Sequence, residues 1–256
     1  MFQGKAVVVT GGASGMGAAA AQRFAQEGAA VCVADRNGAA AEAVARGIVA
    51  AGGTAFACVV DIAEEAGNAR MFDETARRYG KVDVAYLNAG FLGGSVPFAE
   101  LTPAFFQEIV QINLVGLFLG LQKAYAALAP GGAVVVTAST AGVAGMAMNP
   151  AYSAAKHGAL GLVKSASYAF GQKSLRVNAV LPGRVRTAMN EADFLTPLTV
   201  DIVDPETLPV VPYRAEALPQ HVAELVLFLA SPRANYLNGA CIAADGGLTA
   251  QLAPPA

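Results

Sequence analysis

Charged side chains, cysteine and histidine are all scarce in this chain of 256 residues. Only 14% of the residues are charged, the formal net charge is −2 at pH 7, and the basic residues are scattered. No basic stripe is available to bind nucleic acid, and no apolar run reaches the roughly 18 residues of a membrane-spanning helix. The first residues also lack the basic and apolar regions of a signal peptide. We therefore expect a cytoplasmic protein without nucleic-acid or membrane partners.

The few cysteines and histidines argue against disulfide and metal chemistry. Cys32, Cys58 and Cys241 stand far apart in apolar runs, without the spacing of a disulfide framework or a metal site. We expect them to be buried, reduced thiols. His157 and His221 lie far apart with no acidic cluster near either of them. No metal ion and no histidine-based catalytic triad are expected.

Apolar residues, by contrast, make up 55% of the chain, and short β-branched runs alternate with Ala-rich helical runs. Strands are predicted at residues 5–10, 30–34, 54–60, 82–87, 133–138, 176–180 and 240–243. Helices are predicted at residues 16–26, 39–50, 64–79, 103–128, 150–170 and 219–229. Continuous apolar strands separated by helices indicate a parallel sheet covered on both faces, in a doubly wound α/β fold. Residues 1–256 contain no evident linker and are predicted to form one domain.

One segment interrupts this alternation. Residues 188–217 carry several prolines among mixed apolar and acidic residues, and they follow a predicted strand. Ligands bind at the carboxyl edge of such sheets, so a long insertion there predicts a lid over the substrate. A packing loop or a subunit contact is the alternative.

A glycine-rich segment, residues 10–17 (TGGASGMG), joins the first strand to the first helix. Small residues let the backbone approach a pyrophosphate, and the helix start offers unpaired N–H groups and the positive end of its dipole. This position favours a dinucleotide site over a turn without a ligand. The residues expected to bind the cofactor here are Gly11, Ser14, Gly15, Met16 and Gly17.

Asp35 ends the second strand, about 20 residues further on, where an acid that binds the adenosine ribose is expected. Its carboxylate would accept hydrogen bonds from the ribose hydroxyls. It would also repel a 2′-phosphate, by about 4 kcal/mol for like unit charges 4 Å apart. NAD is therefore favoured over NADP. Arg36 keeps NADP open as the alternative, because a guanidinium next to Asp35 could bind the phosphate.

The glycine pattern of residues 10–17 resembles the short-chain dehydrogenase/reductase family, and further motifs match in order and spacing over almost the whole chain. These motifs are Asp61 with Ile62, Asn88-Ala89-Gly90, Asn113, Ser139, Tyr152 with Lys156, the segment from Pro182 through Gly183 and Val185 to Thr187, and Asp245-Gly246-Gly247. The chief departure is Leu87, where many members carry a second asparagine. We expect Leu87 to pack within its strand.

The resemblance implies a Rossmann-like, seven-stranded sheet, a homotetramer, and hydride transfer between NAD(H) and an alcohol or ketone. It implies catalytic roles for Asn113, Ser139, Tyr152 and Lys156. It implies cofactor contacts at Asp61, Ile62, Asn88, Ala89, Gly90, Tyr152, Lys156, Pro182, Gly183, Val185 and Thr187. The apolar surroundings favour a neutral, fairly hydrophobic secondary alcohol or ketone as the substrate.

Tyr152 and Lys156 lie one helical turn apart, in a helix predicted to begin at Asn149 and Pro150. A free tyrosine has a pKa near 10, so it needs about 4 kcal/mol of preferential phenolate stabilisation to titrate near pH 7. One ammonium about 4 Å away supplies that much at an effective dielectric constant of 20. We therefore expect Tyr152 to act as acid and base on the substrate oxygen, with Ser139 hydrogen-bonded to that oxygen.

Three other functions stay open at this point. A sensor or scaffold that binds the cofactor without catalysis would not need the intact set of Asn113, Ser139, Tyr152 and Lys156. Related epimerases and dehydratases also use Tyr-x-x-x-Lys, but they have longer chains and a different glycine spacing. A 3-oxoacyl-carrier-protein reductase would use NADPH and a basic docking patch, which the sequence does not reveal.

Overall fold

Seven strands form one wholly parallel sheet in the computed structural model, which describes residues 1–187, 211–213 and 217–250. The strands are β1 (Ala6–Thr10), β2 (Ala30–Asp35), β3 (Thr54–Val59), β4 (Val82–Leu87), β5 (Leu128–Thr137), β6 (Arg176–Pro182) and β7 (Cys241–Ala244). Their spatial order is β3-β2-β1-β4-β5-β6-β7, so the direction of winding reverses between β1 and β4. Such a reversal leaves a crevice at the carboxyl ends of the strands. The predicted doubly wound α/β fold is confirmed.

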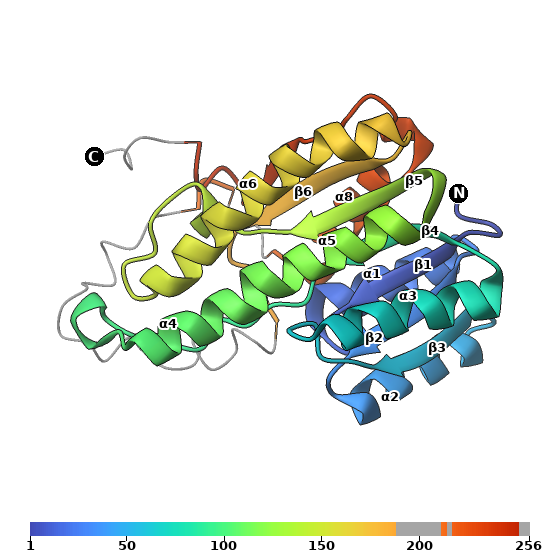
Figure 1. Cartoon of the computed structure of the whole chain (residues 1–256), viewed down its shortest axis with the longest axis horizontal. Helices are drawn as coiled ribbons and strands as arrows, with labels where there is room; N and C mark the ends of the chain where they lie inside the picture. Colours follow the sequence, from blue (N-terminus) through green and yellow to red (C-terminus); the bar gives the residue numbers. More distant parts are fainter. Residues whose placement is uncertain (188–210, 214–216, 251–256) are drawn as a thin grey trace.

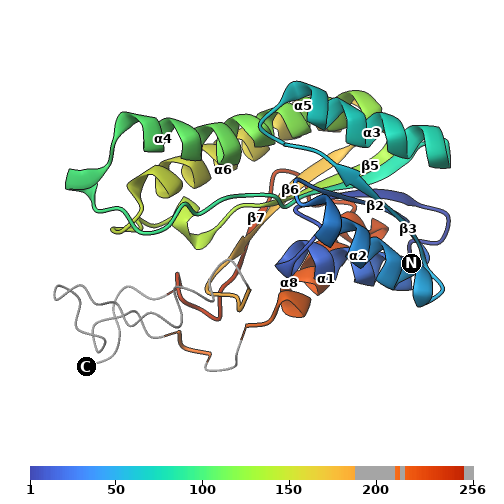
Figure 2. The ribbon, with the colours of Figure 1, turned by 90° about the horizontal axis from the view of Figure 1, so that it is seen from below.

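Helices cover both faces of this sheet (Figures 1 and 2). One layer contains α1 (Gly15–Gln26), α2 (Gly38–Ala50) and α8 (Pro219–Ala230). The other layer contains α3 (Glu65–Tyr79), α4 (Pro103–Val110), α5 (Gly116–Ala127) and α6 (Pro150–Gln172). This is the arrangement that right-handed crossovers on either side of the β1–β4 boundary produce.

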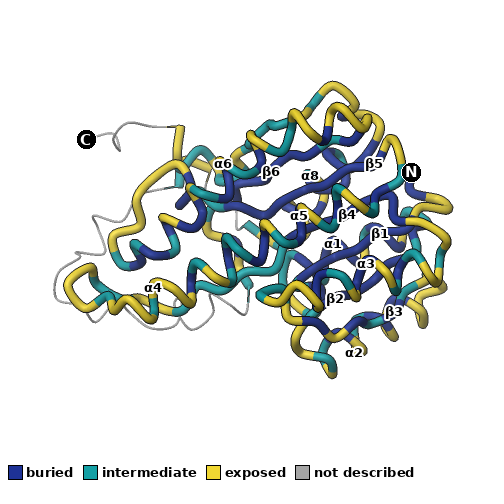
Figure 3. The backbone as a smooth tube through the Cα atoms, in the orientation of Figure 1, coloured by how far each residue is buried: buried dark blue, intermediate teal, exposed yellow. Residues whose placement is uncertain are grey.

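β1 and β4 show why the apolar runs lie in the interior, since every residue of both strands is buried. Figure 3 draws β1, β2, β4 and β6 mainly as dark blue tubes, between helices that are exposed on their outer sides. Each face of the sheet has its own cluster of buried apolar side chains, one around Phe24 and one around Phe72. Cys32 and Cys58 are buried free thiols, as expected, whereas Cys241 is half-buried.

The predicted helix over residues 103–128 differs most from expectation. A π-helical turn, Gln111–Val115, separates α4 from α5, and β5 begins directly at Leu128. The Asn113 side chain donates to the carbonyl of Ile109, four residues earlier, at 3.0 Å. A side chain that occupies this carbonyl competes with the regular helical hydrogen bond, which accounts for the wider turn.

The continuous helical segment from Pro103 to Ala127 also has the length and the apolar composition of a helix that could cross a membrane. Its uninterrupted apolar runs are short, as expected, because polar residues such as Gln107 and Glu108 break them, but the mean hydropathy of the helix stays high. Leu117 and Leu121 of this segment pack into the core beside the sheet.

The predicted lid, residues 188–217, lies almost wholly outside the described residues. Of this segment the structure describes only 211–213 and 217.

Candidate active site

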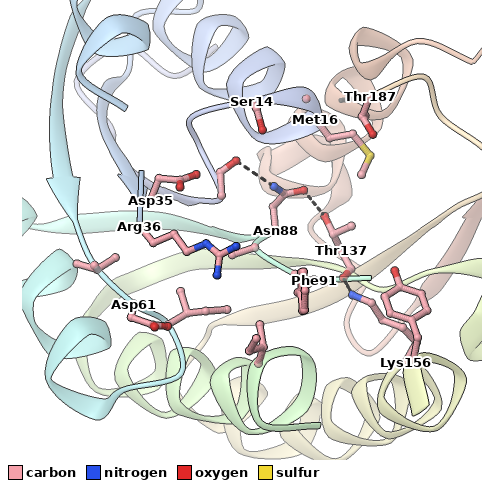
Figure 4. A pocket seen from close by; sticks show the side chains of 18 residues that line it. Ser14, Met16, Asp35, Arg36, Asp61, Asn88, Phe91, Thr137, Lys156 and Thr187 are labelled. Carbon is pink, nitrogen blue, oxygen red and sulfur yellow. Dashed lines mark hydrogen bonds between the residues drawn. The ribbon is translucent and has the colours of Figure 1, made fainter. Parts of the chain in front are cut away.

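A pocket of about 260 Å³ lies at the carboxyl ends of β1, β2 and β4, where the winding of the sheet reverses. In Figure 4, Asp35, Arg36 and Asp61 lie at one end of it, and Thr137 and Lys156 at the other. The residues that line it are Gly11, Ser14, Gly15, Met16, Asp35, Arg36, Val60, Asp61, Ile62, Asn88, Ala89, Gly90, Phe91, Ile112, Thr137, Tyr152, Lys156 and Thr187.

The glycine-rich loop has the backbone that its sequence requires. Gly11 and Gly15 have φ angles of +63° and +51°, in the left-handed region that glycine adopts without strain. Ser14, the N-cap residue of α1, makes no capping hydrogen bond with its side chain. The start of α1 therefore faces the pocket with N–H groups that suit an anion. Gly17 does not line the pocket; its Cα packs against the carbonyl of Gly11, leaving no room for a side chain.

At the acidic end, both carboxylates are held by the loops that follow their strands. Asp35 accepts hydrogen bonds from Ala13 N at 3.1 Å and from Asn37 N at 2.9 Å. Asp61 accepts one from Ala63 N at 2.8 Å. Each carboxylate keeps further acceptor capacity for hydroxyl groups of a ligand.

Arg36 reaches across this end of the pocket. Its guanidinium carbon lies 5.8 Å from the centre of the Phe91 ring, and both residues line the pocket. Arg36 and Asp35 therefore line the same end of one cavity.

A chain of buried hydrogen bonds runs beneath the pocket and joins three strands. The Thr137 hydroxyl lies 2.8 Å from the Tyr86 hydroxyl and 3.0 Å from Asn88 Oδ1. Asn88 Nδ2 donates to Thr10 O at 3.1 Å, and the Thr10 hydroxyl accepts from Asn88 N at 2.9 Å. Burial raises the pKa of Tyr86, so this phenol stays protonated within the chain. The ends of β1, β4 and β5 are thus locked to one another below the glycine-rich loop.

Tyr152 and Lys156 enter the opposite end of the pocket from the first turns of α6. The helix begins as predicted: Asn149 is the N-cap, its side chain accepts from Tyr152 N at 3.0 Å, and Pro150 follows. Lys156 Nζ lies 5.4 Å from the centre of the Tyr152 ring and donates to Thr137 O at 3.0 Å. Ser139 does not line the pocket, but its side chain is hydrogen-bonded to that of Tyr152.

Asn113 lies behind this end, in the π-helical turn. Its side chain is 3% exposed and pairs with both backbone groups of Phe91, accepting from N at 3.1 Å and donating to O at 2.7 Å. With Lys156 and Thr137 it lines a second, smaller cavity of about 10 Å³ next to the main pocket. Asn113 thus contacts the wall of the pocket without entering it.

Comparison with known proteins agrees with this geometry. Residues 11–249 match the model of a family described as enoyl-(acyl carrier protein) reductase. The 2,5-dichloro-2,5-cyclohexadiene-1,4-diol dehydrogenase of Sphingobium indicum is 36% identical, over 97% of this chain and 98% of its own length. The cis-4-hydroxycyclohexanecarboxylate dehydrogenase of Sinomonas cyclohexanicum is 37% identical, over 97% and 98%. The crystal structure of a levodione reductase, 34% identical, superposes with a TM-score of 0.90 over 98% of this chain and 99% of its own.

The chain belongs to the short-chain dehydrogenase/reductase family. It is therefore an oxidoreductase that transfers a hydride between a nicotinamide dinucleotide and a secondary alcohol or ketone. The pocket fits such a cofactor, because it joins a glycine-rich anion site to carboxylates at one end and to a lysine at the other.

The environment of the short-chain dehydrogenase's tyrosine adds a contribution that the sequence does not reveal. Burial raises the pKa of Tyr152 to about 12, against a lowering effect of the Ser139 hydrogen bond. Burial also lowers the pKa of Lys156 to about 8. In the chain by itself, desolvation therefore opposes the lowering of the Tyr152 pKa that is predicted for the site with its cofactor. Desolvation outweighs an ammonium that lies above the ring face and binds Thr137 O.

The Pro-Gly segment of the dehydrogenase contributes less to the pocket than the resemblance implies. Thr187 lines it, but Pro182, Gly183 and Val185 do not. Val185 is 2% exposed and packs into the core around Phe24. Leu87, where the family often has asparagine, is buried within β4, as expected.

Four lining residues were missed by reasoning from the sequence: Val60, Phe91, Ile112 and Thr137. Phe91 and Val60 directly adjoin motif residues, so a wider window around each motif would have found them. Thr137 could have been found from strand periodicity, since it lies two residues before Ser139 on the same strand end. Ile112 adjoins Asn113 and would also have been found with a wider window around that motif; it lies in the π-helical turn.

Proposed function

We propose that this chain is an NAD-dependent dehydrogenase in which Tyr152 exchanges a proton with the oxygen of a secondary alcohol or ketone. One observation carries this proposal: Tyr152 lines the same pocket as Lys156 and is hydrogen-bonded to Ser139. A phenol, an ammonium and a hydroxyl that meet in a desolvated pocket form the set that acid–base chemistry on a carbonyl requires.

Each catalytic side chain has a distinct part in the proposed reaction. When bound, the nicotinamide group supplies the hydride chemistry and, in its oxidised form, a positive charge. Tyr152 holds the proton at its hydroxyl oxygen, and Ser139 donates to the substrate oxygen as charge develops on it. Lys156 favours the phenolate and binds the nicotinamide ribose. Asn113 supports a water path that leads the proton away from Lys156.

The cofactor contacts divide along the pocket. Gly11, Ser14, Gly15 and Met16 hold the pyrophosphate at the start of α1, and Gly17 seats that helix against the loop. The adenosine lies among Asp35, Arg36, Asp61 and Ile62, and the central part of the cofactor lies along Asn88, Ala89 and Gly90. Thr187 contacts the carboxamide of the nicotinamide. Pro182, Gly183 and Val185 fix the backbone that leads to Thr187.

NAD is the proposed cofactor because Asp35 keeps acceptor capacity at the edge of the pocket. The negative charge of its carboxylate disfavours a 2′-phosphate there. Arg36 beside it supports NADP as the alternative, since its guanidinium already reaches across the same end of the pocket.

The proposed substrate carries its hydroxyl or keto group on a six-membered carbon ring. Two of the relatives above are named for substrates of this kind, a cyclohexadienediol and a hydroxycyclohexanecarboxylate. Phe91 packs with Tyr152 against one apolar cluster and lines the pocket, which favours a neutral ring over the carboxylate.

We also propose a cytoplasmic homotetramer that forms one domain per chain, without nucleic-acid or membrane partners. Apolar side chains on the outer helices support an oligomer: Phe118 on α5 is 46% exposed and Phe106 on α4 is 38% exposed. Light scattering at several protein concentrations would test the tetramer.

Separate titrations with NAD and NADP, followed by a panel of alcohols, test the proposed function. Reduction of NAD is monitored by nicotinamide absorbance with cyclohexanol, cis-4-hydroxycyclohexanecarboxylate and a linear secondary alcohol. We expect the highest kcat/KM for cyclohexanol with NAD. Tight NAD binding without turnover of any alcohol would instead favour a cofactor sensor.

A further inference from the structure

Asn149 does more than cap the helix that carries Tyr152. Its side chain is buried, with the residue only 1% exposed, and it uses all of its principal hydrogen-bonding groups. Oδ1 accepts from Tyr152 N at 3.0 Å, while Nδ2 donates to Leu92 O at 2.6 Å and to Gly94 O at 2.8 Å. One amide thus connects the start of α6 to the loop that follows β4.

The loop that Asn149 binds, residues 91–94, has little to hold it by itself. Gly93 and Gly94 have φ angles of +78° and +87°, and adjacent glycines have the greatest backbone freedom to lose on ordering. Nδ2 of Asn149 bonds on either side of Gly93, at Leu92 O and Gly94 O. Order in the loop therefore depends on bonds from outside it.

This loop begins with Phe91, which forms part of the pocket wall. Asn113 fixes the backbone of Phe91 through two hydrogen bonds, and Asn149 fixes the residues that follow. The Asn149 amide is bonded at its other end to the backbone of Tyr152. Asn149 therefore ties the loop that continues from Phe91 to the turn of α6 that carries Tyr152, while Asn113 holds Phe91 itself.

We infer that Asn149 is a positioning residue. It holds the loop of residues 91–94, which begins with Phe91 in the pocket wall, in a fixed position relative to Tyr152, and so orients the substrate ring. The inference rests on the proposed function. It goes beyond it by giving a specificity role to a residue that contacts neither the reacting atoms nor the cofactor pocket. Misplacement of reacting groups by about 1 Å can cost a hundredfold in rate.

Two substitutions separate this role from helix capping. Serine and aspartate cap helices about as well as asparagine, but neither can donate two hydrogen bonds to Leu92 O and Gly94 O. For Asn149→Ser and Asn149→Asp, we expect kcat for cyclohexanol to fall by about tenfold to a hundredfold. KM should rise, and the deuterium isotope effect on kcat for ring-deuterated cyclohexanol should increase, because the hydride-transfer step becomes more rate-limiting.

Thr102→Ser is the matched control. Thr102 caps α4 through a 3.2 Å bond from Phe105 N, is exposed, and does not line the pocket. This substitution keeps a helix cap and should leave kcat, KM and the isotope effect at their wild-type values.

Rates are referred to the concentration of NAD-binding sites, so partial unfolding lowers neither kcat nor the isotope effect. Wild-type kinetics from Asn149→Asp would overturn the inference and leave Asn149 a helix cap. A lower kcat with an unchanged isotope effect and KM would also overturn it. Wild-type enzyme without turnover would instead refute the proposed function, before either variant is assayed.

Discussion

The two ends of the pocket are built in different ways. At the acidic end, the carboxylates of Asp35 and Asp61 accept hydrogen bonds from backbone groups two residues further along the chain. At the other end, Lys156 is 3% exposed and binds a carbonyl of β5, while Tyr152 is bonded to Ser139 after that strand. The acidic end depends mainly on local loop geometry. The tyrosine end depends on burial and on contacts between distant elements.

This difference explains why the two ends should respond differently to substitution. A carboxylate held only by backbone N–H groups can be exchanged with an effect mainly on ligand choice, even though Asp35 also accepts from Ala13 N in the glycine-rich loop. A buried phenol and ammonium affect both catalysis and the free energy of folding, because desolvation shifts their pKa values in opposite directions.

The largest expected effect is at the tyrosine end. Tyr152→Phe removes the proton donor and acceptor but keeps the ring, so kcat should fall by about 10²- to 10⁴-fold. The NAD dissociation constant, measured by titration, should stay close to that of the wild type. Tyr168→Phe, on the same helix with Tyr168 77% exposed, is the control and should be fully active. Retained activity in Tyr152→Phe would show that Tyr152 is not the proton donor and acceptor, and that the tyrosine end of the pocket has no special role in catalysis.

A change of ligand choice is the expected effect at the acidic end. Asp35→Ser removes the charge that opposes a 2′-phosphate and leaves Arg36 to bind it, so the ratio of kcat/KM for NAD over NADP should fall by about a hundredfold. The melting temperature should change little. Asp73→Ser, at an exposed position of α3, serves as the charge control. An unchanged ratio would mean that Asp35 does not discriminate between the cofactors.

The smallest effect concerns stability, and it has a defined pH dependence. Burial lowers the pKa of Lys156 from 10.5 to about 8 in the folded chain. Between these two pH values the unfolded chain therefore binds more protons than the folded chain. The free energy of unfolding of the wild type consequently increases as pH rises from the lower value to the higher. Lys156→Met should be more stable than wild type at pH 7, by about 2 kcal/mol, and this advantage should shrink by pH 10.

Urea unfolding of the cofactor-free protein at both pH values measures this difference. Lys164→Met, at an exposed position on the same helix, should differ little from wild type at either pH. An advantage of the same size at pH 7 and pH 10 would show that the charge of Lys156 is not its source.

The sequence predicted those features that depend on local order. All seven strands were located from apolar runs, and the start of α6 from Asn149 and Pro150. The glycine-rich loop was found because its φ angles leave few alternatives to glycine. The raised pKa of Tyr152 could not be predicted, because it follows from burial by distant elements, and neither could the bonds of Asn149 to Leu92 and Gly94, which lie 57 and 55 positions away. Periodicity carries no information on such contacts.

The π-helical turn makes this stretch of helix tolerant of a change in chain length. Such a turn contains one residue more than a turn of α-helix. Deletion of a single residue within Gln111–Val115 would convert it to a turn of regular helix and leave α4 at nearly the same rotation relative to α5. Ile109 would then stay in the core, but the wide turn that carries Asn113 against Phe91 would be lost. One residue can therefore be removed here without disturbing the packing of either helix, whereas the same deletion elsewhere in α4 or α5 would rotate the helix out of its packing.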